Sequence, residues 1–360
     1  MDHSRLCLPE GLFTEESCKA AQERIRFELL VDFALVSREE EETGNFPPRP
    51  SEPLAFLLHG VLTEEECKFL RDRIDCELQG AKRVDITNRE CDRAVLRSPE
   101  LAKCCFARAR PFLEKIVRHF EVHAVEQSEG QQDRVECMQS FTSREGFADE
   151  LQFHAPQQQH PPLPVTLTGY DASRVLLSDE KSFNWEGSWE LDSMKEVVTC
   201  LRYAPGDYFD QHEDDNQDGP GHSLETPVKS LFTGLLYLNS DFSGGSTNFK
   251  SHTDGHPVLL ELNAGDVKAA GASGCLLFFF QKGLLHEGYK VQSGNKYVIR
   301  SDLFYKQVEK GALSPEEQQG LELLKEAREL FAAGDIARSQ KKWDQACKLN
   351  SAVQRMSFEG

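Results

Sequence analysis

The sequence lacks several features that would place it in a specialised class of protein. Its longest uninterrupted apolar run is CLLFFF, at 275–280, which is far shorter than the roughly 20 residues that a membrane-spanning helix needs. Its 11 cysteines include no C-x-x-C pair and are odd in number, which argues against a thiolate zinc site and a disulfide framework. An apolar content of 39% and a charged content of 28% exclude a collagen or a wholly disordered chain. The composition predicts a globular protein with reduced, mostly buried thiols.

Positive charge is also scarce. Lys and Arg total 41 against 60 Asp and Glu, so the net charge is −19 with histidine neutral. This surplus repels phosphate, which makes nucleic acid a poor partner. The first residues show no basic stretch followed by an apolar one, so we expect no secretory signal and an intracellular protein, cytoplasmic or nuclear. A length of 360 residues favours one large domain with appendages, or two domains.

A repeat near the N-terminus suggests how the chain is divided. Residues 11–29 (GLFTEESCKAAQERIRFEL) match residues 60–78 (GVLTEEECKFLRDRIDCEL) at 10 of 19 positions. Thr14 and Thr63 each precede acidic residues and apolar positions at helical spacing, so both copies are predicted to be N-capped amphipathic helices. The segment between them has the acidic, proline-containing composition of a linker. We therefore predict an N-terminal helical segment and linker over 1–50, dispensable for chemistry.

The rest of the chain changes character along its length. A helical pattern continues over 79–123, and a polar tract with little periodicity at 124–190 is predicted to be an insertion. Short β-rich runs separated by Gly, Asp, Asn and Ser follow at 196–306, and such spacing is typical of a sandwich or barrel. After residue 314 two helical stretches joined at 332–335 predict a helical hairpin. The predicted units are thus 51–310, which contains the insertion, and a C-terminal hairpin over 311–360.

Histidine and aspartate in the β-rich region form a candidate metal site. In LRYAPGDYFDQHEDD, His212 and Asp214 are two residues apart, and side chains at that spacing on a strand face the same side. With the later His286, two imidazoles and one carboxylate leave three positions of an octahedral ion open, which is the arrangement of non-haem Fe(II) oxygenases. Lys296 and Arg300 follow at even spacing, and either can bind the far carboxylate of a dicarboxylate cosubstrate.

In order and spacing, six segments resemble the prolyl 4-hydroxylase-like branch of the 2-oxoglutarate and Fe(II)-dependent dioxygenases. They are GVLTEEECKFL (60–70), LRYAPGDYFDQHED (201–214), LLYLN (235–239), FSGGSTNF (242–249), CLLFFF (275–280) and HEGYKVQSGNKYVIRSDLFY (286–305). The resemblance implies a double-stranded β-helix, a jelly roll of the cupin kind, with helices packed on one side. Together with the predicted hairpin, the expected fold is α+β, with a jelly-roll core, N-terminal supporting helices and a C-terminal helical hairpin.

The same resemblance implies roles for individual residues. They are the iron ligands and catalytic centre His212, Asp214 and His286; the cosubstrate base Lys296, with Arg300 as its competitor; Tyr237, whose hydroxyl reaches the cosubstrate; and the pocket walls Tyr203 and Thr247. The implied reaction consumes O₂ and 2-oxoglutarate, releases succinate and CO₂, and hydroxylates a C–H bond, with ascorbate as reductant. The expected substrate is a prolyl or similar side chain of a protein, with a small molecule as the other possibility.

Two other interpretations stay open. A catalytically silent interaction protein on the same fold would bind a protein partner through its N-terminal helices and C-terminal hairpin. Residues 214–225 also match the calcium-loop pattern D-x-N-x-D-G-x₅-E in full, with Glu225 at position twelve, although such a loop needs a helix on each side. The substrate is not predicted, because no motif occurs in the 124–190 tract.

Overall fold

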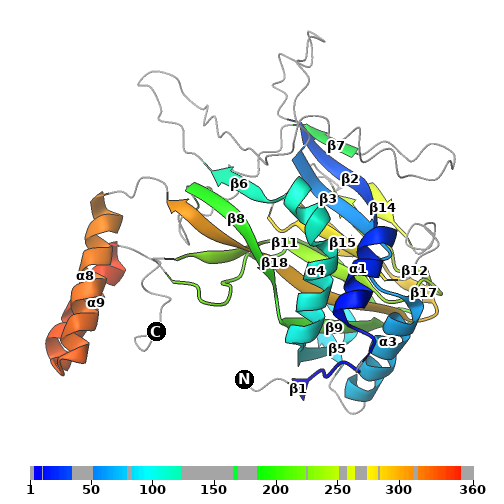
Figure 1. Cartoon of the computed structure of the whole chain (residues 1–360), viewed down its shortest axis with the longest axis horizontal. Helices are drawn as coiled ribbons and strands as arrows, with labels where there is room; N and C mark the ends of the chain where they lie inside the picture. Colours follow the sequence, from blue (N-terminus) through cyan, green and yellow to red (C-terminus); the bar gives the residue numbers. More distant parts are fainter. Residues whose placement is uncertain are drawn as a thin grey trace, which may run out of the picture.

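The computed structural model describes residues 4–9, 11–34, 52–78, 83–86, 88–122, 165–168, 185, 187–223, 226–250, 258–263, 274–282, 284–310 and 315–349. Within these ranges the chain forms a mostly antiparallel sheet and five helices (Figure 1). Of the described strand pairs, β1 (Ser4–Arg5) with β5 (Arg89–Arg97) and β2 (Arg26–Ala34) with β7 (Val165–Thr168) are parallel.

The described helices are α1 (Glu15–Arg24), α3 (Glu64–Leu78), α4 (Pro99–Ile116), α8 (Pro315–Ala332) and α9 (Ile336–Leu349). Both copies of the repeat begin as predicted. The Thr14 hydroxyl accepts a hydrogen bond from the Ser17 N–H at 3.1 Å. Thr63 and Glu66 form a capping box, in which each side chain bonds the backbone N–H of the other residue, at 3.2 and 2.8 Å. The two predicted N-caps are therefore confirmed.

The two copies of the repeat end differently. The helix α3 continues to the end of the second copy, whereas α1 stops at Arg24 and the chain continues as the strand β2. The prediction of a helix through residue 29 is therefore wrong. Residues 26–33 (RFELLVDF), which begin in the first copy and extend past it, alternate apolar with polar residues at most positions, and pairing with β3 (Glu52–His59) fixes this stretch as a strand.

This strand ties the N-terminal segment to the rest of the sheet. β2 lies before the predicted boundary near residue 50 and β3 lies after it, and the two strands pair. β3 in turn pairs with β15 (Cys275–Phe280). Ile25 and Leu30 are buried in the same core as the central strands. The boundary stays a prediction, but these contacts lead us to expect that the N-terminal segment is needed for folding rather than dispensable.

The region after α3 also differs from its prediction. Strands β4 (Val84–Ile86) and β5 precede α4, and β6 (His119–Val122) follows it, so a continuous helical pattern over 79–123 is wrong. The tract predicted as an insertion at 124–190 lies largely outside the described residues. Within it, β7 pairs with β2, and β8 (Gly187–Met194), which begins there, pairs with β6 and β18 (Lys296–Lys310).

The β-rich region contains the strands predicted for it. VVTCLRY, LFTGLLYLN, CLLFFF and KYVIRSDLFY fall largely or wholly in β9, β11, β15 and β18. Besides β15 and β18, the strands are β9 (Val197–Tyr203), β10 (Tyr208–His212), β11 (Val228–Tyr237), β12 (Ser243–Gly244), β13 (Thr247–Lys250), β14 (Val258–Leu262), β16 (His286–Gly288) and β17 (Val291–Ser293).

The sheet has two parts that share β5. One part runs in the order β5-β9-β18-β11-β15-β3-β2-β7, and the other in the order β14-β13-β16-β10-β5. β5 pairs with β9 through residues 92–97 and with β10 through Arg89 and Glu90. Because residues of the candidate site lie on both parts, the continuation of the sheet through β5 brings them to one place.

The helices α1, α3 and α4 gather beside the sheet (Figure 1) and share one large apolar core with it. Within this core the rings of Phe56, Phe232 and Phe278 pack with centroid separations of 5.4 to 6.1 Å. A buried ion pair joins two of the helices, since Arg108 of α4 contacts Glu66 of α3 at 2.6 Å. The three helices therefore support the sheet as one packed unit.

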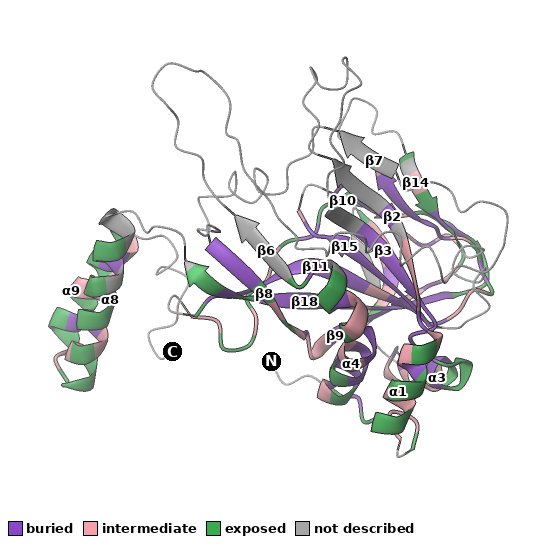
Figure 2. Cartoon of the chain, turned by 45° about the horizontal axis from the view of Figure 1, so that its top comes forward, coloured by how far each residue is buried: buried purple, intermediate pink, exposed green. Residues whose placement is uncertain are grey.

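The C-terminal helices form the predicted hairpin. α8 and α9 pack on each other around Leu324 and Ala346, a cluster separate from the main core. Both views show the hairpin away from the sheet (Figures 1 and 2). None of the described helices is long and apolar enough to cross a membrane. The ten cysteines that the structure describes are all free thiols, as predicted.

Candidate metal centre and cosubstrate pocket

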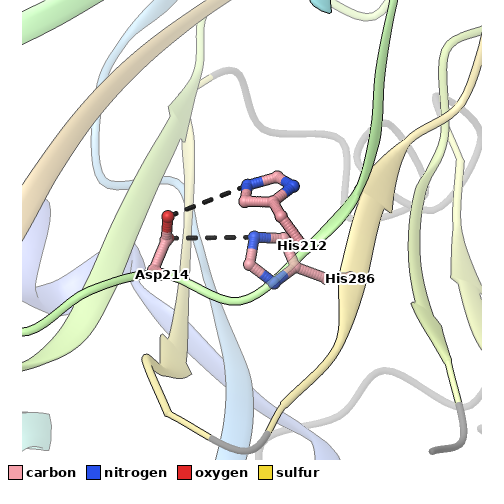
Figure 3. Close-up of side chains that lie close together, drawn as sticks. All are labelled: His212, Asp214 and His286. Carbon is pink, nitrogen blue, oxygen red and sulfur yellow. Dashed lines mark ion pairs between the residues drawn. The ribbon is translucent and has the colours of Figure 1, made fainter. Parts of the chain in front are cut away.

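The predicted ligands His212, Asp214 and His286 lie together (Figure 3). One nitrogen from each histidine and one oxygen from the aspartate all lie within 4.8 Å of one another. The Nε2 atoms of His212 and His286 are each 3.8 Å from a carboxylate oxygen of Asp214. Among the described residues this is the one group of His, Cys, Asp and Glu with the spacing of a metal site.

Strand pairing accounts for this meeting of residues that are distant in sequence. β10 and β16 are antiparallel neighbours in which His212 lies directly opposite His286. Asp214 follows two residues after the end of β10, and its N–H donates to the Gln281 carbonyl oxygen at 3.2 Å. The triad therefore depends on the register of one strand pair and on one backbone hydrogen bond.

Each imidazole is oriented by its own backbone neighbourhood. The Nδ1 atoms of His212 and His286 lie 2.8 and 3.0 Å from the carbonyl oxygens of Asp210 and Leu284. A protonated Nδ1 donates to that oxygen, which leaves the Nε2 lone pair directed at the centre of the triad. Burial lowers the pKa of both side chains, that of His212 to about 4 with a further contribution from His286, so both are neutral at pH 7, as metal ligands must be.

The Asp214 carboxylate is held from two sides. The Thr233 hydroxyl donates to Oδ2 at 2.7 Å, and the Arg300 guanidinium lies 3.1 Å from Oδ1. Gln281 donates in turn to the Thr233 hydroxyl, at 3.2 Å. Burial alone would raise the pKa of Asp214, but Arg300, the histidines and Thr233 together bring it below its usual range. The carboxylate is therefore ionised and fixed in position.

This donor set fits Fe(II). Two neutral imidazole nitrogens and one ionised carboxylate oxygen match the ligand types of a facial site, and hydrogen bonds to all three ligands fix their orientation. One described pocket contains the triad. It is lined by Arg89, Arg93, Thr199, Leu201, Tyr203, Phe209, His212, Asp214, Leu235, Thr247, Phe279, His286, Glu287, Gly288, Tyr289, Lys296, Val298 and Arg300.

Lys296 is a buried cation in this pocket. It is 4% exposed, and its Nζ donates to the Gly245 carbonyl oxygen at 2.7 Å. No described carboxylate pairs with it, and burial lowers its pKa to about 7. Its ammonium lies 5.1 Å from the Tyr237 ring centre and 5.8 Å from that of Tyr203. A desolvated ammonium without an anion is a site where a carboxylate binds favourably.

The other predicted pocket residues surround Lys296. Tyr203 lies opposite it in the pairing of β9 with β18, and both line the pocket. Thr247 lines the pocket too, and its hydroxyl is 3.5 Å from the Lys296 ammonium. The Tyr237 hydroxyl bonds the Thr247 hydroxyl, but Tyr237 is not among the lining residues. The structure thus brings the predicted residues together. Tyr237 does not line the pocket itself but contacts Thr247, which does.

No family model matches the chain, and no curated protein matches it. Solved structures do match. The chain resembles prolyl hydroxylases. It is 16% identical to the viral collagen prolyl hydroxylase of Paramecium bursaria Chlorella virus-1, solved with 2-oxoglutarate, over 70% of this chain and 96% of that one, with a TM-score of 0.35. A Pseudomonas putida prolyl 4-hydroxylase is 10% identical over 72% and 94%, with a TM-score of 0.32.

A third similar structure is the Trichoplax adhaerens prolyl hydroxylase in complex with a peptide fragment of the hypoxia-inducible factor oxygen degradation domain. It is 12% identical over 70% of this chain and 83% of that one, with a TM-score of 0.34. The roles of individual residues in this chain are argued from the geometry of its own pocket.

The predicted competition between Lys296 and Arg300 looks different in three dimensions. Both side chains face the pocket, as even spacing on β18 requires. Arg300, however, is engaged by Asp214 and by Asp302, whose Oδ1 lies 3.4 Å from its guanidinium. Of these two predicted cations, Lys296 is the one without a carboxylate partner among the described residues, and its ammonium is therefore the one left to bind an anion.

The calcium hypothesis does not fit the surroundings of its loop. The segment that begins at Asp214 runs between strands β10 and β11, whereas a calcium loop of this pattern lies between two helices. Asp214 faces the histidines, and Asn216 donates to the Ser230 carbonyl oxygen at 2.7 Å. Glu225 lies outside the described residues. The loop is therefore not an EF-hand.

Three residues of the site escaped the sequence prediction: one supports a ligand and two line the pocket. Thr233 supports Asp214 from the apolar run LFTGLLYL, where a lone buried hydroxyl needs a hydrogen-bond partner. Arg89 and Arg93 line the pocket from β5, a stretch predicted to be helical. The available signal was the start of RECDRAVLR, where basic residues at 89 and 93 flank acidic residues at 90 and 92. On a strand this spacing puts the two arginines on one face and the two acids on the other.

Proposed function

We propose that this protein is a 2-oxoglutarate-dependent Fe(II) dioxygenase built on a double-stranded β-helix. It hydroxylates a C–H bond of a prolyl or similar side chain in a protein and releases succinate and CO₂. One observation carries the proposal: a His-Asp-His triad and a buried lysine without an acidic partner line the same pocket. The first fits Fe(II), and the second fits the far carboxylate of 2-oxoglutarate.

The residues of this chain divide the work of such a reaction. His212, Asp214 and His286 would hold Fe(II), which when bound supplies the activation of O₂ by oxidative decarboxylation of 2-oxoglutarate. Lys296 would anchor the cosubstrate at the end far from the metal. Thr233 and the Asp210 and Leu284 carbonyl groups orient the ligands. The apolar walls formed by Leu201, Leu235, Phe279 and Val298 exclude water.

Metal and cosubstrate binding test the proposal without knowledge of the substrate. Fe(II) and 2-oxoglutarate added under nitrogen should give the visible charge-transfer absorbance of the chelate, which requires both components. Exposure to air should then release succinate slowly, and ascorbate should prolong this uncoupled turnover. A protein that binds Fe(II) but gives neither the absorbance nor succinate would instead support the catalytically silent alternative.

Lys296→Ala is expected to raise the half-saturating 2-oxoglutarate concentration about ten- to hundredfold, because a charge-assisted hydrogen bond in a closed pocket contributes about 1.5–3 kcal/mol. Anaerobic titration followed by the chelate absorbance measures this. Arg300→Ala serves as the comparison, since its guanidinium is already engaged by Asp214 and Asp302, and a smaller rise is expected. A larger rise for Arg300→Ala would reverse the assignment.

The affinity for 2-oxoglutarate should fall as pH rises above about 7. Burial lowers the pKa of Lys296 to about 7, so the free protein loses the ammonium above this pH. A bound carboxylate favours the charged form, and the apparent dissociation constant should therefore increase by up to about tenfold per pH unit. Titrations between about pH 6 and about pH 9 measure the slope. Lys296→Arg, whose guanidinium stays protonated, should flatten it, and an unchanged slope in that variant would contradict the explanation.

A further inference from the structure

The strand β5 presents two arginines to the pocket. Arg89 and Arg93 both line it, as residues four apart on one strand can. The acidic residues between them have partners of their own: Glu90 pairs with Arg83 at 3.0 Å, and Asp92 pairs with Arg202 at 2.8 Å. The alternation of β5 therefore separates its charges, with paired carboxylates on one face and cations on the pocket face.

Arg89 is placed beside the candidate metal centre. Its guanidinium carbon lies 3.4 Å from the Phe209 ring centre, and the Phe209 ring stacks on His212 with centroids 3.6 Å apart. The pairing of Arg89 with Phe209 between β5 and β10 fixes this stack. Its Nε is buried and has no hydrogen-bond partner among the described residues. A buried donor left without an acceptor costs free energy, which an incoming acceptor would recover.

The charges of the pocket do not balance. It is lined by four cations, Arg89, Arg93, Lys296 and Arg300, and by two anions, Asp214 and Glu287. Arg300 engages Asp214. Glu287 forms an ion pair with Lys250 at 2.6 Å. With Lys296 assigned to 2-oxoglutarate, Arg89 and Arg93 have no carboxylate partner among the described residues. They lie in a protein of net charge −19, in which acidic partners are plentiful.

We infer that Arg89 and Arg93 bind an anionic group of the substrate, namely the carboxylate of an Asp or Glu side chain next to the residue that is hydroxylated. This rests on the proposed function. A guanidinium presents two parallel N–H donors that match a carboxylate, and stacking on Phe209 holds the Arg89 plane in place. The arginines would thereby select acidic sequences and set the target C–H bond beside the triad.

Short fluorescent peptides with a central proline test this inference. One set carries a single Glu at each flanking position in turn, and a matched set carries Gln there. Binding is measured by anisotropy under nitrogen, with the protein loaded with Fe(II) and 2-oxoglutarate, so that no turnover is needed. The best Glu peptide should bind about tenfold or more tightly than its Gln partner, because it gains a charge-assisted contact.

Arg89→Gln and Arg93→Gln should each reduce this preference, and the double variant should remove it. Arg97→Gln is the control, because Arg97 lies on the same strand but is not among the pocket-lining residues and is paired with Glu196, so its loss should leave the preference intact. The half-saturating 2-oxoglutarate concentration, measured without peptide, should change by no more than about twofold in the single variants. A rise as large as that of Lys296→Ala would show that the arginines bind the cosubstrate and would overturn the inference.

Other outcomes also contradict it. Equal binding of Glu and Gln peptides, no binding of either set, or a preference that survives the double variant would each overturn it. Failure of the proposed function would look different, because Fe(II)-dependent succinate release would then be absent in the unmodified protein, whereas the anisotropy comparison would still report on the arginines.

Discussion

His286→Ala is expected to abolish Fe(II)-dependent consumption of 2-oxoglutarate. His286 supplies one of only three protein ligands, and its Nε2 lies 3.8 Å from the Asp214 carboxylate with Nδ1 held by the Leu284 carbonyl oxygen. Loss of a group that merely supports a ligand costs roughly 10- to 100-fold in metal affinity or activity, so loss of the ligand itself should cost more. Succinate release and the iron content of the purified variant measure the two effects.

A neighbouring pair of aspartates provides the control. Asp214→Asn removes the carboxylate charge at the same size and should lower iron retention and turnover together. Asp215→Asn removes a charge one residue further on, but Asp215 is 87% exposed and contacts Lys282 rather than the triad, so it should behave as the unmodified protein does. Near-normal turnover in His286→Ala or Asp214→Asn would show that the ligand assignment is wrong.

The metal site was predictable because its signal is local. The H-x-D spacing keeps two ligands close in sequence, and the β-rich composition predicts the strand at 208–212 that carries His212. Asp214 lies two residues beyond that strand, where its N–H bonds the Gln281 carbonyl oxygen rather than a strand neighbour. The third ligand, His286, was inferred from the ligand types of such a site and from the family resemblance, and the structure places it opposite His212 in the neighbouring strand β16. No local pattern, however, predicts the strand register of β18. This register is what lets Arg300 reach Asp214 rather than the far end of the pocket.

The errors have a common physical origin. Residues 26–29 and the stretch after 79 were expected to be helical because of neighbouring helical patterns, but they contribute to the strands β2, β4 and β5. Short stretches with mixed periodicity take the form that their neighbours in space impose, and both stretches find partners in the sheet. Because β5 was among them, Arg89 and Arg93 were not recognised as pocket residues from the sequence.

The same pairing makes the N-terminal segment important for stability. Arg24 of α1 donates to the Gly60 carbonyl oxygen at 2.8 Å, and Ser17 accepts from Arg108 of α4 at 2.8 Å. Leu6, Ile25 and Leu30 are buried. Burial of a large apolar side chain contributes about 1.5–3 kcal/mol, so these three residues contribute roughly 5–9 kcal/mol, comparable with the roughly 5–15 kcal/mol that stabilises a whole domain.

Deletion of residues 1–50 is therefore expected to unfold or aggregate the protein. It removes α1 and β2, so that β3 keeps only its partner β15 and becomes an apolar edge strand. Thermal unfolding followed by circular dichroism, and the soluble yield, measure the effect. Deletion of residues 311–360 is the matched control, since it removes a similar length of chain whose helices α8 and α9 form their own cluster, and it should leave the melting temperature of the remainder nearly unchanged. The N-terminal deletion could instead give a soluble protein with a normal melting temperature and normal 2-oxoglutarate consumption. The first 50 residues would then be the dispensable segment that the linker composition suggests. The pairing of β2 with β3 would in that case contribute little to stability.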